Sequence, residues 1–280
     1  MGLKKHNGKR PSVLAIHLIL ISWSLVVLFP LWTMLVNSIK PKREIFRHPF
    51  GIPDEITFEG YRHAWTGANF DIYFRNSIFV TVVSLLLILV LGSLAAYAMA
   101  NWRSRTSNLV YLFFIAGLMV PIRLGTINIF QMIIAMGLAG SIFSLIPIYV
   151  AMGLPIATFV LTTFIRELPH EIFDAARVDG ASEWRIYWTI ILPLVRPALA
   201  TVAIFDLIPI WNDIWFPLIF NLADNHRTVA IGVSLLFGQY QTNWTRVLSA
   251  LSLSAVPILI LYLLMSKQFI KGLTAGAVKG

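Results

Sequence analysis

The sequence predicts an all-α integral membrane protein with six transmembrane helices. Of its 280 residues, 58% are apolar and only 12% are charged, and the mean hydropathy is +0.76. A soluble domain carries about 25% charged residues, so half that content cannot cover a water-exposed surface. The apolar residues also gather in runs of about 20, the length that a helix needs to cross the hydrocarbon core. We therefore expect residues 1–280 to form a single transmembrane domain.

Six apolar segments are long enough to be the expected spans, and the third is followed by a helical-looking stretch at 127–138. The first segment follows four basic residues between positions 4 and 10. Its apolar run is too long for a cleaved signal peptide, so we expect it to remain as an anchor. Because six is an even number, both termini must face the same side. The expected spans lie at about 13–39, 77–100, 109–122, 142–165, 194–220 and 247–270.

Basic residues predict the orientation of these spans. With the N-terminus inside, 13 Lys and Arg residues fall in cytoplasmic segments and nine in outer segments. Cytoplasmic segments are enriched in Lys and Arg, so we expect both termini in the cytoplasm of a multi-pass protein of the inner (plasma) membrane. The net charge of +9 would also suit a nucleic-acid partner. The basic residues interrupt apolar runs instead of lining a polar face, which argues against nucleic acid.

Two missing sequence features exclude some chemistry. The chain has no cysteine, so it can form neither a disulfide nor a thiolate metal site. It also has no Gly-x-x-x-x-Gly-Lys-Ser/Thr run, so it carries no P-loop of its own.

Small residues and prolines indicate how the spans pack. Gly92, Ala96 and Ala100 share one helical face, which lets a second helix approach closely. This second helix belongs either to the same chain or to another subunit. Prolines stand inside or at the ends of most spans and kink them, as expected for helices that bend around a pathway.

The polar segment 166–197 between the fourth and fifth spans predicts two short cytoplasmic helices. Pro169 suits the first position of the first helix, where its missing N–H costs nothing. Glu171 and Asp174 place negative charge in the first turns, which is favourable against the helix dipole. Glu167 shares their face, but acids interleaved with arginines in a cytosolic loop are ordinarily solvated, so we expect no metal site.

A glycine hinge separates the first of these helices from the second. Asp179-Gly180 supplies the turn, and Ser182 is a good cap for the second helix. Leu192-Pro193 is expected to end this helix just before the fifth span. Its aromatic face either lies on the protein's own cytoplasmic ends or the lipid headgroups, or it docks a cytosolic partner. That face comprises Trp184, Tyr187, Trp188 and Ile191.

The same segment resembles the EAA motif of ABC-importer permeases. The motif reads Glu-Ala-Ala, three residues, Gly, nine residues and Ile-x-Leu-Pro. This chain keeps every spacing and departs only in having Asp in place of the leading Glu. The Asp-Gly-Ala-Ser run at 179–182 and the Leu-Pro-Leu run at 192–194 are typical of the carbohydrate branch. The matching residues are Asp174-Ala175-Ala176, Gly180 and Ile190-Ile191-Leu192-Pro193.

Three further stretches resemble the smaller permease subunit of maltose-type sugar importers. The resemblance covers essentially the whole chain, and the number of spans also matches the core of that family. The stretches are Ile56–Tyr61, Trp211-Asn212-Asp213 and the closing Gly272–Gly280.

The resemblance implies a type I ABC-importer permease bundle with a cytoplasmic coupling helix. Such a subunit is not an enzyme and binds no cofactor, because partner subunits hydrolyse the ATP. The implied partners are a second homologous permease subunit, two ATP-binding subunits, an extracytoplasmic sugar-binding protein and the carbohydrate substrate. The residues implied to couple the loop to the ATPase are Glu171, Asp174, Ala175, Ala176, Asp179, Gly180, Ala181, Trp184, Leu192 and Pro193.

Polar side chains within the fifth span are candidates for the translocation path. A carboxylate in hydrocarbon is costly, so Asp206 is expected to face a cavity, a subunit interface or a hydrogen-bonding helix. Asp213, seven residues on, lies near the outer end, where it serves the same path or sits at headgroup level. Asn212 suits either sugar hydroxyls or helix packing.

A stand-alone secondary transporter or channel is the alternative function. Such proteins show internal repeats with interrupted helices at corresponding places. Here the polar loop occurs once, and no symmetry relates the two halves. An intramembrane enzyme is a third class, but the spans contain no nucleophile–His pair or paired metal-ligand spacing.

Overall fold

The computed structural model describes residues 13–102, 104–220, 222–238 and 242–277. All regular elements among them are helical, as the sequence predicted. The basic residues between positions 4 and 10, Arg103, residues 278–280 and the side chains of Lys267 and Lys271 lie outside the described part. The chain divides into two compact units. Unit 1 comprises Met1–Ala64 and Leu236–Leu253, and unit 2 comprises Trp65–Leu235 and Ser254–Gly280.

Five described helices are long and apolar enough to cross a membrane. A pair of shorter helices, bent against each other, brings the number to six if the pair counts as one span. This agrees with the predicted six-helix fold class. The five spans are Val13–Ser38, Phe70–Asn101, Ile142–Arg166, Arg196–Ile219 and Trp244–Leu264, and the bent pair joins Arg105–Met119 to Ile122–Ala135.

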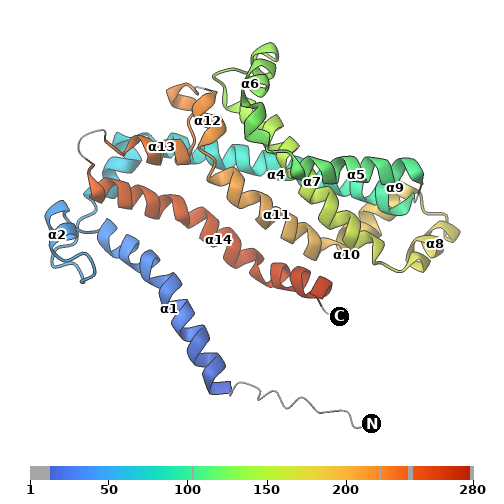
Figure 1. Ribbon diagram of the computed structural model, residues 1–280, viewed down its shortest axis with the longest axis horizontal. Coiled ribbons are helices and arrows are strands. Elements are labelled where there is room, and N and C mark those ends of the chain that lie inside the picture. Colours follow the sequence, from blue (N-terminus) through green and yellow to red (C-terminus); the bar gives the residue numbers. More distant parts are fainter. Residues whose placement is uncertain (1–12, 103, 221, 239–241, 278–280) are drawn as a thin grey trace, which may run out of the picture. The chain divides into compact units, whose positions relative to one another are not determined.

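The third span is interrupted where the sequence allowed a continuation. Helix α5 (Arg105–Met119) has 15 residues and is therefore about 22 Å long, less than the hydrocarbon thickness. Val120 precedes Pro121 and adopts an extended backbone, because the proline ring disfavours a helical residue before it. The following segment, with α6 (Thr126–Ala135), is bent by 84° from α5, which Figure 1 shows as a sharp turn.

Unit 1 contains α1 (Val13–Ser38) and the first turns of α14 (Trp244–Ala277). The hydroxyl of Ser249 donates to the carbonyl of Ser38 at 2.8 Å, and Thr245 donates to that of Lys40 at 3.1 Å. These bonds fasten α14 to the end of α1. Almost all apolar side chains of α1 lack contacts with the rest of this chain and are exposed, as expected for a helix covered by lipid or another subunit. The short helices here are α2 (Lys42–Arg47) and α3 (Glu59–Arg62).

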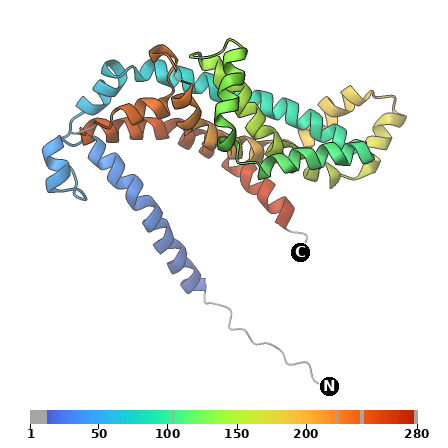
Figure 2. The same ribbon diagram turned by 45° about the horizontal axis from the view of Figure 1, so that its top comes forward.

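Unit 2 is built on three helices that pack lengthwise against one another (Figures 1 and 2). Helix α4 (Phe70–Asn101) lies along α7 (Leu145–Arg166), and α11 (Arg196–Trp211) contacts both. A Cβ atom at Gly92 would lie 2.7 Å from the Cβ of Ala157, so glycine permits the close approach of α4 and α7. The close approach predicted at Gly92 is confirmed, and the second helix belongs to the same chain.

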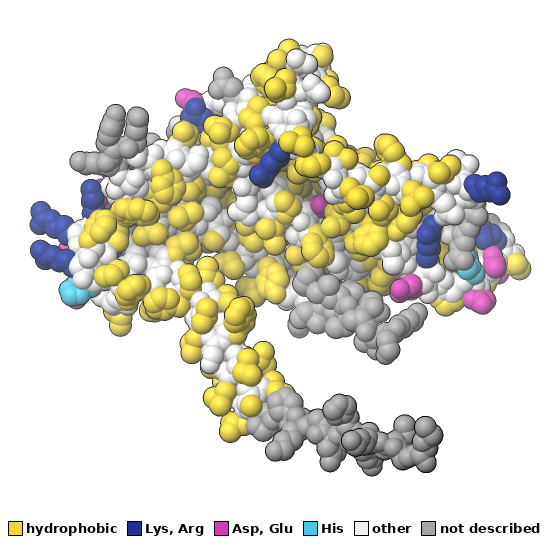
Figure 3. Space-filling model, viewed as in Figure 1, with side chains coloured by type: hydrophobic (Ala, Val, Ile, Leu, Met, Phe, Trp, Pro, Cys, Tyr) yellow, Lys and Arg dark blue, Asp and Glu magenta, His cyan; other side chains and the backbone are white. Residues whose placement is uncertain are grey.

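The remaining elements are short helices between the longer ones. In Figure 3 the lateral surface over α5 and α7 is mostly hydrophobic, whereas acidic and basic side chains gather at the end that carries α8 and α9. These elements are η1 (His63–Gly67), η2 (Ile122–Gly125), η3 (Ile142–Ser144), α8 (His170–Val178), α9 (Glu183–Ile186), η4 (Tyr187–Ile191), α10 (Leu192–Leu194), α12 (Trp215–Ile219), η5 (Asp224–His226) and α13 (Val229–Leu235).

Candidate functional site

The loop between α7 and α11 folds as two short helices joined at a glycine, as predicted. Gly180 has φ +78°, and its N–H donates to the carbonyl of Arg177 at 3.0 Å. The N–H of Ala181 donates to the carbonyl of Ala176 at 2.9 Å. This pair of bonds is the Schellman arrangement, which satisfies the last carbonyls of α8 and needs a left-handed residue. The glycine therefore fixes the angle between the two helices.

The caps of the loop helices differ slightly from the prediction. The Oγ of Ser182 accepts from the N–H of Arg185 at 3.3 Å, so the predicted cap of α9 is confirmed. Pro169 is the N-cap of α8 and not its first helical residue. The second helix does not end at Leu192-Pro193, because its backbone continues through η4 and α10 to Leu194. Pro193 lacks the N–H that an α-helix needs at that position, and the preceding turn widens into a π-helix.

Helix α8 turns one face inward and presents its acids outward. Phe173 and Ala176 are buried against the core, while Asp174 and Ala175 are exposed. Of the residues that the motif implied, Ala181 and Leu192 are half-buried. The exposed ones are Glu171, Asp174, Ala175, Asp179, Gly180, Trp184 and Pro193.

A polar network at Glu183 fastens the loop to the end of α4. Glu183 Oε2 accepts from the Tyr97 hydroxyl at 2.6 Å and from Asn101 Nδ2 at 3.0 Å, and both donors lie on α4. Its Oε1 accepts from Arg177 Nε of α8 at 2.8 Å. Arg177 also donates to Asn101 Oδ1 at 2.7 Å and pairs with Asp174 Oδ1 at 3.1 Å. One carboxylate thus joins α4, α8 and α9.

The ionisation of this network favours the charged pair. The guanidinium of Arg177, followed by the Tyr97 hydroxyl, holds the pKa of Glu183 below its usual value against the opposing effect of burial. The Glu183 carboxylate in turn raises the pKa of Arg177. Sequence reasoning did not single out Tyr97, Asn101, Arg177 or Glu183. The polar pair of residues 97 and 101, four apart at the end of an apolar span, was a signal that could have found the α4 side.

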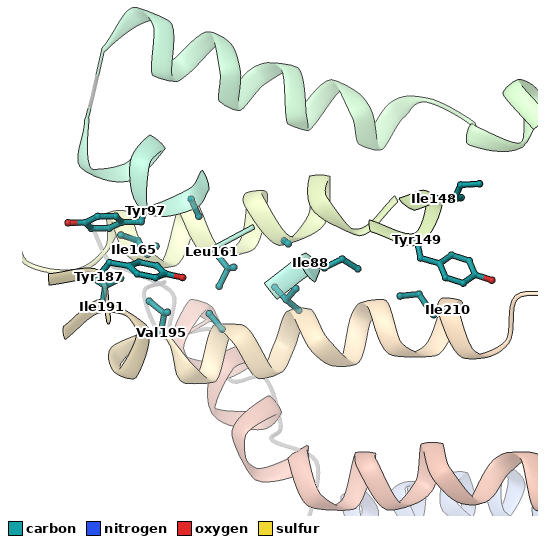
Figure 4. Close-up of a cluster of buried hydrophobic side chains, with 14 of the residues drawn as sticks. Ile88, Tyr97, Ile148, Tyr149, Leu161, Ile165, Tyr187, Ile191, Val195 and Ile210 are labelled. Atoms are coloured by element: carbon teal, nitrogen blue, oxygen red, sulfur yellow. The ribbon is translucent and has the colours of Figure 1, made fainter. Parts of the chain in front are cut away.

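The aromatic face predicted for the second helix is divided between two environments. Tyr187 is 2% exposed and Ile191 is fully buried, whereas Trp184 is 61% exposed and Trp188 is 42% exposed. Tyr187 shares a 2.7 Å hydrogen bond with Ser93 and packs on the ring of Tyr97, beside which Figure 4 shows it. The rings of Trp184, Tyr187 and Trp188 contact one another, with centroids 5.1–5.9 Å apart, so the predicted aromatic face is present and has a buried and an exposed side. Only the two tryptophans remain available to a partner.

A pocket of about 530 Å³ lies between α7, α11 and α12. Tyr149 and Ile210, which line it, are labelled in Figure 4 at the end of the buried cluster away from Tyr97 and Tyr187. All three polar residues predicted for a translocation path line it. The polar and aromatic residues around it are Arg123, Tyr149, Asp206, Asn212, Asp213 and Trp215.

Asp213 and Asn212 are engaged by the chain itself. Asp213 accepts from the Tyr149 hydroxyl at 2.9 Å, from the N–H of Trp215 at 3.1 Å and from that of Phe216 at 3.2 Å. It thereby holds the start of α12 against α7. Asn212 Nδ2 donates to the carbonyl of Ile208 at 2.9 Å. Both side chains stabilise the break between α11 and α12.

Asp206 differs from them because it is buried without such partners. Its side chain lies on α11 and is 6% exposed, and no described residue donates to its Oδ2 atom. Opposite it, a Cβ at Gly153 of α7 would lie 3.1 Å from the Asp206 Cγ atom. Asp206 lines the pocket, which is one of the alternatives that the sequence left open for it.

Comparison with known proteins identifies the chain. The family of binding-protein-dependent transport system inner membrane components matches residues 88–272. This chain belongs to that family. It is therefore the membrane component of a transport system, not an enzyme and not a stand-alone transporter. The EAA-type loop and the pocket both lie within the matched residues.

Relatives within this family resemble the chain over nearly its whole length. The diacetylchitobiose uptake system permease protein of Streptomyces coelicolor is 34% identical, covering 94% of this chain and 88% of the relative. The melibiose/raffinose/stachyose import permease protein of Bacillus subtilis is 31% identical over 90% of this chain and 91% of that protein.

Solved structures confirm the permease fold. A bacterial ABC transporter involved in the import of the acidic polysaccharide alginate superposes with a TM-score of 0.76 at 21% identity, covering 91% of this chain and 95% of that chain. The same kind of transporter in complex with an alginate-bound periplasmic protein gives a TM-score of 0.67 at 18% identity. At these identities the likeness establishes the fold of the inner membrane component.

Proposed function

We propose that this chain is a pore-forming subunit of an ATP-driven carbohydrate importer and couples ATP hydrolysis to translocation through segment 166–197. The observation that carries the proposal is the fold of this segment. It presents exposed acids and two tryptophans outward while Glu183 fastens it to α4. A surface that both contacts a partner and is held by the transmembrane helices suits the transfer of a conformational change.

The partners follow from what the chain lacks and from its family. The chain has no P-loop, which supports ATP hydrolysis by partner subunits, two of them by the resemblance to ABC-importer permeases, with no cofactor bound by this chain. A second homologous permease subunit completes the pathway, with residues 1–280 of this chain acting as one transmembrane domain. An extracytoplasmic binding protein delivers the solute, as the name of the family indicates.

A carbohydrate substrate is supported by the names of the relatives, which concern chitobiose and raffinose-type sugars. The distribution of charge supports an orientation with both termini and segment 166–197 in the cytoplasm. Asn101 of α4 belongs to the same end as this segment, because it bonds directly to Arg177 and Glu183.

The experiment compares two matched charge reversals in the complete complex in proteoliposomes. Asp174 and Asp224 each form an i,i+3 ion pair with an arginine and have largely exposed side chains. Such surface pairs contribute at most about 1 kcal/mol, so both reversals should leave folding intact. We expect Asp174→Lys to abolish ATP hydrolysis stimulated by the binding protein, and Asp224→Lys to preserve it.

Gly180→Pro provides a second perturbation of the coupling loop. It destroys the Schellman turn, whose φ of +78° proline cannot adopt. Membrane insertion should persist while sugar uptake and stimulated ATP hydrolysis are lost. Wild-type stimulation in both Asp174→Lys and Gly180→Pro would refute the assignment of the loop.

A further inference from the structure

One carboxylate oxygen in the pocket between α7, α11 and α12 is not used by the protein. Asp206 is 6% exposed, and its Oδ2 atom has no hydrogen-bond partner in the described part of the chain. Leaving a buried polar atom unpaired destabilises the protein unless a ligand supplies the missing donor. A Cβ at position 153 would lie 2.5 Å from Ile88 Cδ1 and 3.1 Å from the Asp206 Cγ atom, so glycine lets α7 pack closely on this carboxylate. The pocket therefore keeps one strong acceptor available to a ligand.

The second carboxylate of the pocket, Asp213, is not available as an acceptor for a ligand. Three donors occupy Asp213, namely the Tyr149 hydroxyl and the N–H groups of Trp215 and Phe216. Ca²⁺ takes about six to eight oxygen ligands, which a single available carboxylate does not provide. Arg123 lines the same pocket and disfavours an organic cation. The ligand that fits is a neutral molecule with hydroxyl donors.

Trp215 gives the pocket a fixed aromatic wall. Its Nε1 donates to Thr126 Oγ1 at 3.1 Å, and the guanidinium of Arg123 lies 5.5 Å from the ring centroid. The hydrogen bond fixes the edge of the indole and the guanidinium covers one of its faces, although Trp215 remains 41% exposed. An aromatic ring beside a hydrogen-bond acceptor matches a pyranose, which has apolar C–H faces and hydroxyls around its edge.

We propose that this pocket is a carbohydrate subsite of the permease subunit itself. Asp206 accepts a hydrogen bond from a hydroxyl of a pyranose ring that lies against Trp215. The volume of about 530 Å³ is within the range of about 300–1,000 Å³ typical of small-molecule sites. The inference rests on the proposed function, because it takes the imported solute to be a sugar.

The absence of cysteine from the chain makes a direct test practical. Met152→Cys places a single thiol on the pocket wall of the complete complex, whose other subunits are made cysteine-free. Its reaction with a charged methanethiosulfonate is measured with maltose, raffinose or N,N′-diacetylchitobiose present. All three contain the pyranose ring that the subsite recognises, so we expect at least one of them to slow the labelling.

Two variants show whether protection depends on the proposed contacts. In Met152→Cys with Asp206→Asn, the sugar concentration for half-protection should rise about 2- to 10-fold, as expected for weakening one hydrogen bond. Trp215→Leu should have a similar effect through the lost ring contact. Asp224→Asn removes an exposed carboxylate outside the pocket and should leave protection unchanged.

Several results would overturn the subsite. One is labelling that none of the three sugars slows, and another is protection that survives both Asp206→Asn and Trp215→Leu. A thiol that reacts in the isolated chain but not in the complex would mean that the second permease subunit covers the pocket. Sugar uptake is measured in parallel. Uptake without protection contradicts the subsite alone, whereas protection without ATP-driven uptake supports the subsite and contradicts the proposed function.

Discussion

Replacing Glu183 by alanine should detach the coupling loop from α4. The ion pair with Arg177 contributes at most about 1 kcal/mol, because the two side chains are 40% and 37% exposed. The hydrogen bond from the buried Tyr97 hydroxyl to a charged acceptor contributes about 1.5–3 kcal/mol. Taking the lower part of both ranges gives about 2 kcal/mol, which shifts the docking equilibrium about 30-fold.

The assay for Glu183→Ala combines hydrogen exchange with a transport measurement in the complete complex. We expect amides of α8 and α9 to exchange faster and more ATP to be hydrolysed per sugar imported. The ATP-binding subunits should still copurify, because the exposed acids of α8 remain. Glu167→Ala, an exposed acid of the same loop outside the network, is the control. The effects of Tyr97→Phe and Glu183→Ala should be non-additive, because both substitutions remove the same hydrogen bond between these two side chains.

The reasoning fails if Glu183→Ala leaves both the exchange rates and the ratio of ATP to sugar unchanged. It also fails if the two substitutions are strictly additive, since the carboxylate and the phenol would then act independently.

Further predictions concern the network, the loop and the helix packing. Because the pKa of Glu183 is lowered on folding from its ordinary value of 4.5, its stabilisation is complete above that value and is lost as the pH falls through the lowered pKa. The protection factors of the α8 amides, which correct for the pH dependence of intrinsic exchange, should therefore be constant from about pH 6 to 8 and fall in acid. A Cβ at position 180 would meet no atom within 4 Å, so Gly180→Ala should add no clash. Thermal unfolding should show the free energy of unfolding lowered only by the cost of a left-handed backbone, about 1–2 kcal/mol. Gly92→Ala should destabilise by about 1–3 kcal/mol through its clash with Ala157, and Ala157→Gly should restore the melting temperature. Asn76→Ala removes two partly buried hydrogen bonds, to the carbonyls of Asn225 and Arg227, and should cost about 1–3 kcal/mol in the same measurement, at about 0.5–1.5 kcal/mol for each bond.

Local chemistry explains which features the sequence could predict. Long apolar runs have one stable form in a membrane, since a helix satisfies every backbone group internally. The hinge follows from two residues, because Gly180 tolerates a positive φ and Ser182 caps the next helix. The small side chain of Gly92 likewise indicates a close contact, though not which helix makes it.

Features that depend on distant contacts escaped prediction. Glu183 is 86 residues from Tyr97 in the chain, and nothing local indicates that their side chains meet. The aromatic face meets two environments because Tyr187 shares a hydrogen bond with Ser93, 94 residues away in the chain, which nothing local indicates. A π-turn and a sharp bend both result from proline, but the sequence does not say which one follows a given proline, as Pro193 and Pro121 illustrate.

The coupling loop is joined to the transmembrane helices in two different ways, and this decides where its motion can go. Side-chain hydrogen bonds attach it to α4, and these can break and re-form. Backbone continuity attaches it to α11 through η4 and α10, with only Val195 between the two helices. Asp206 is ten residues into α11, about 15 Å along its axis. A rigid helix of that length carries a displacement of the loop to the pocket without a flexible linker. We therefore expect α11 to move with the loop, and the Glu183 network to determine whether α4 moves with it.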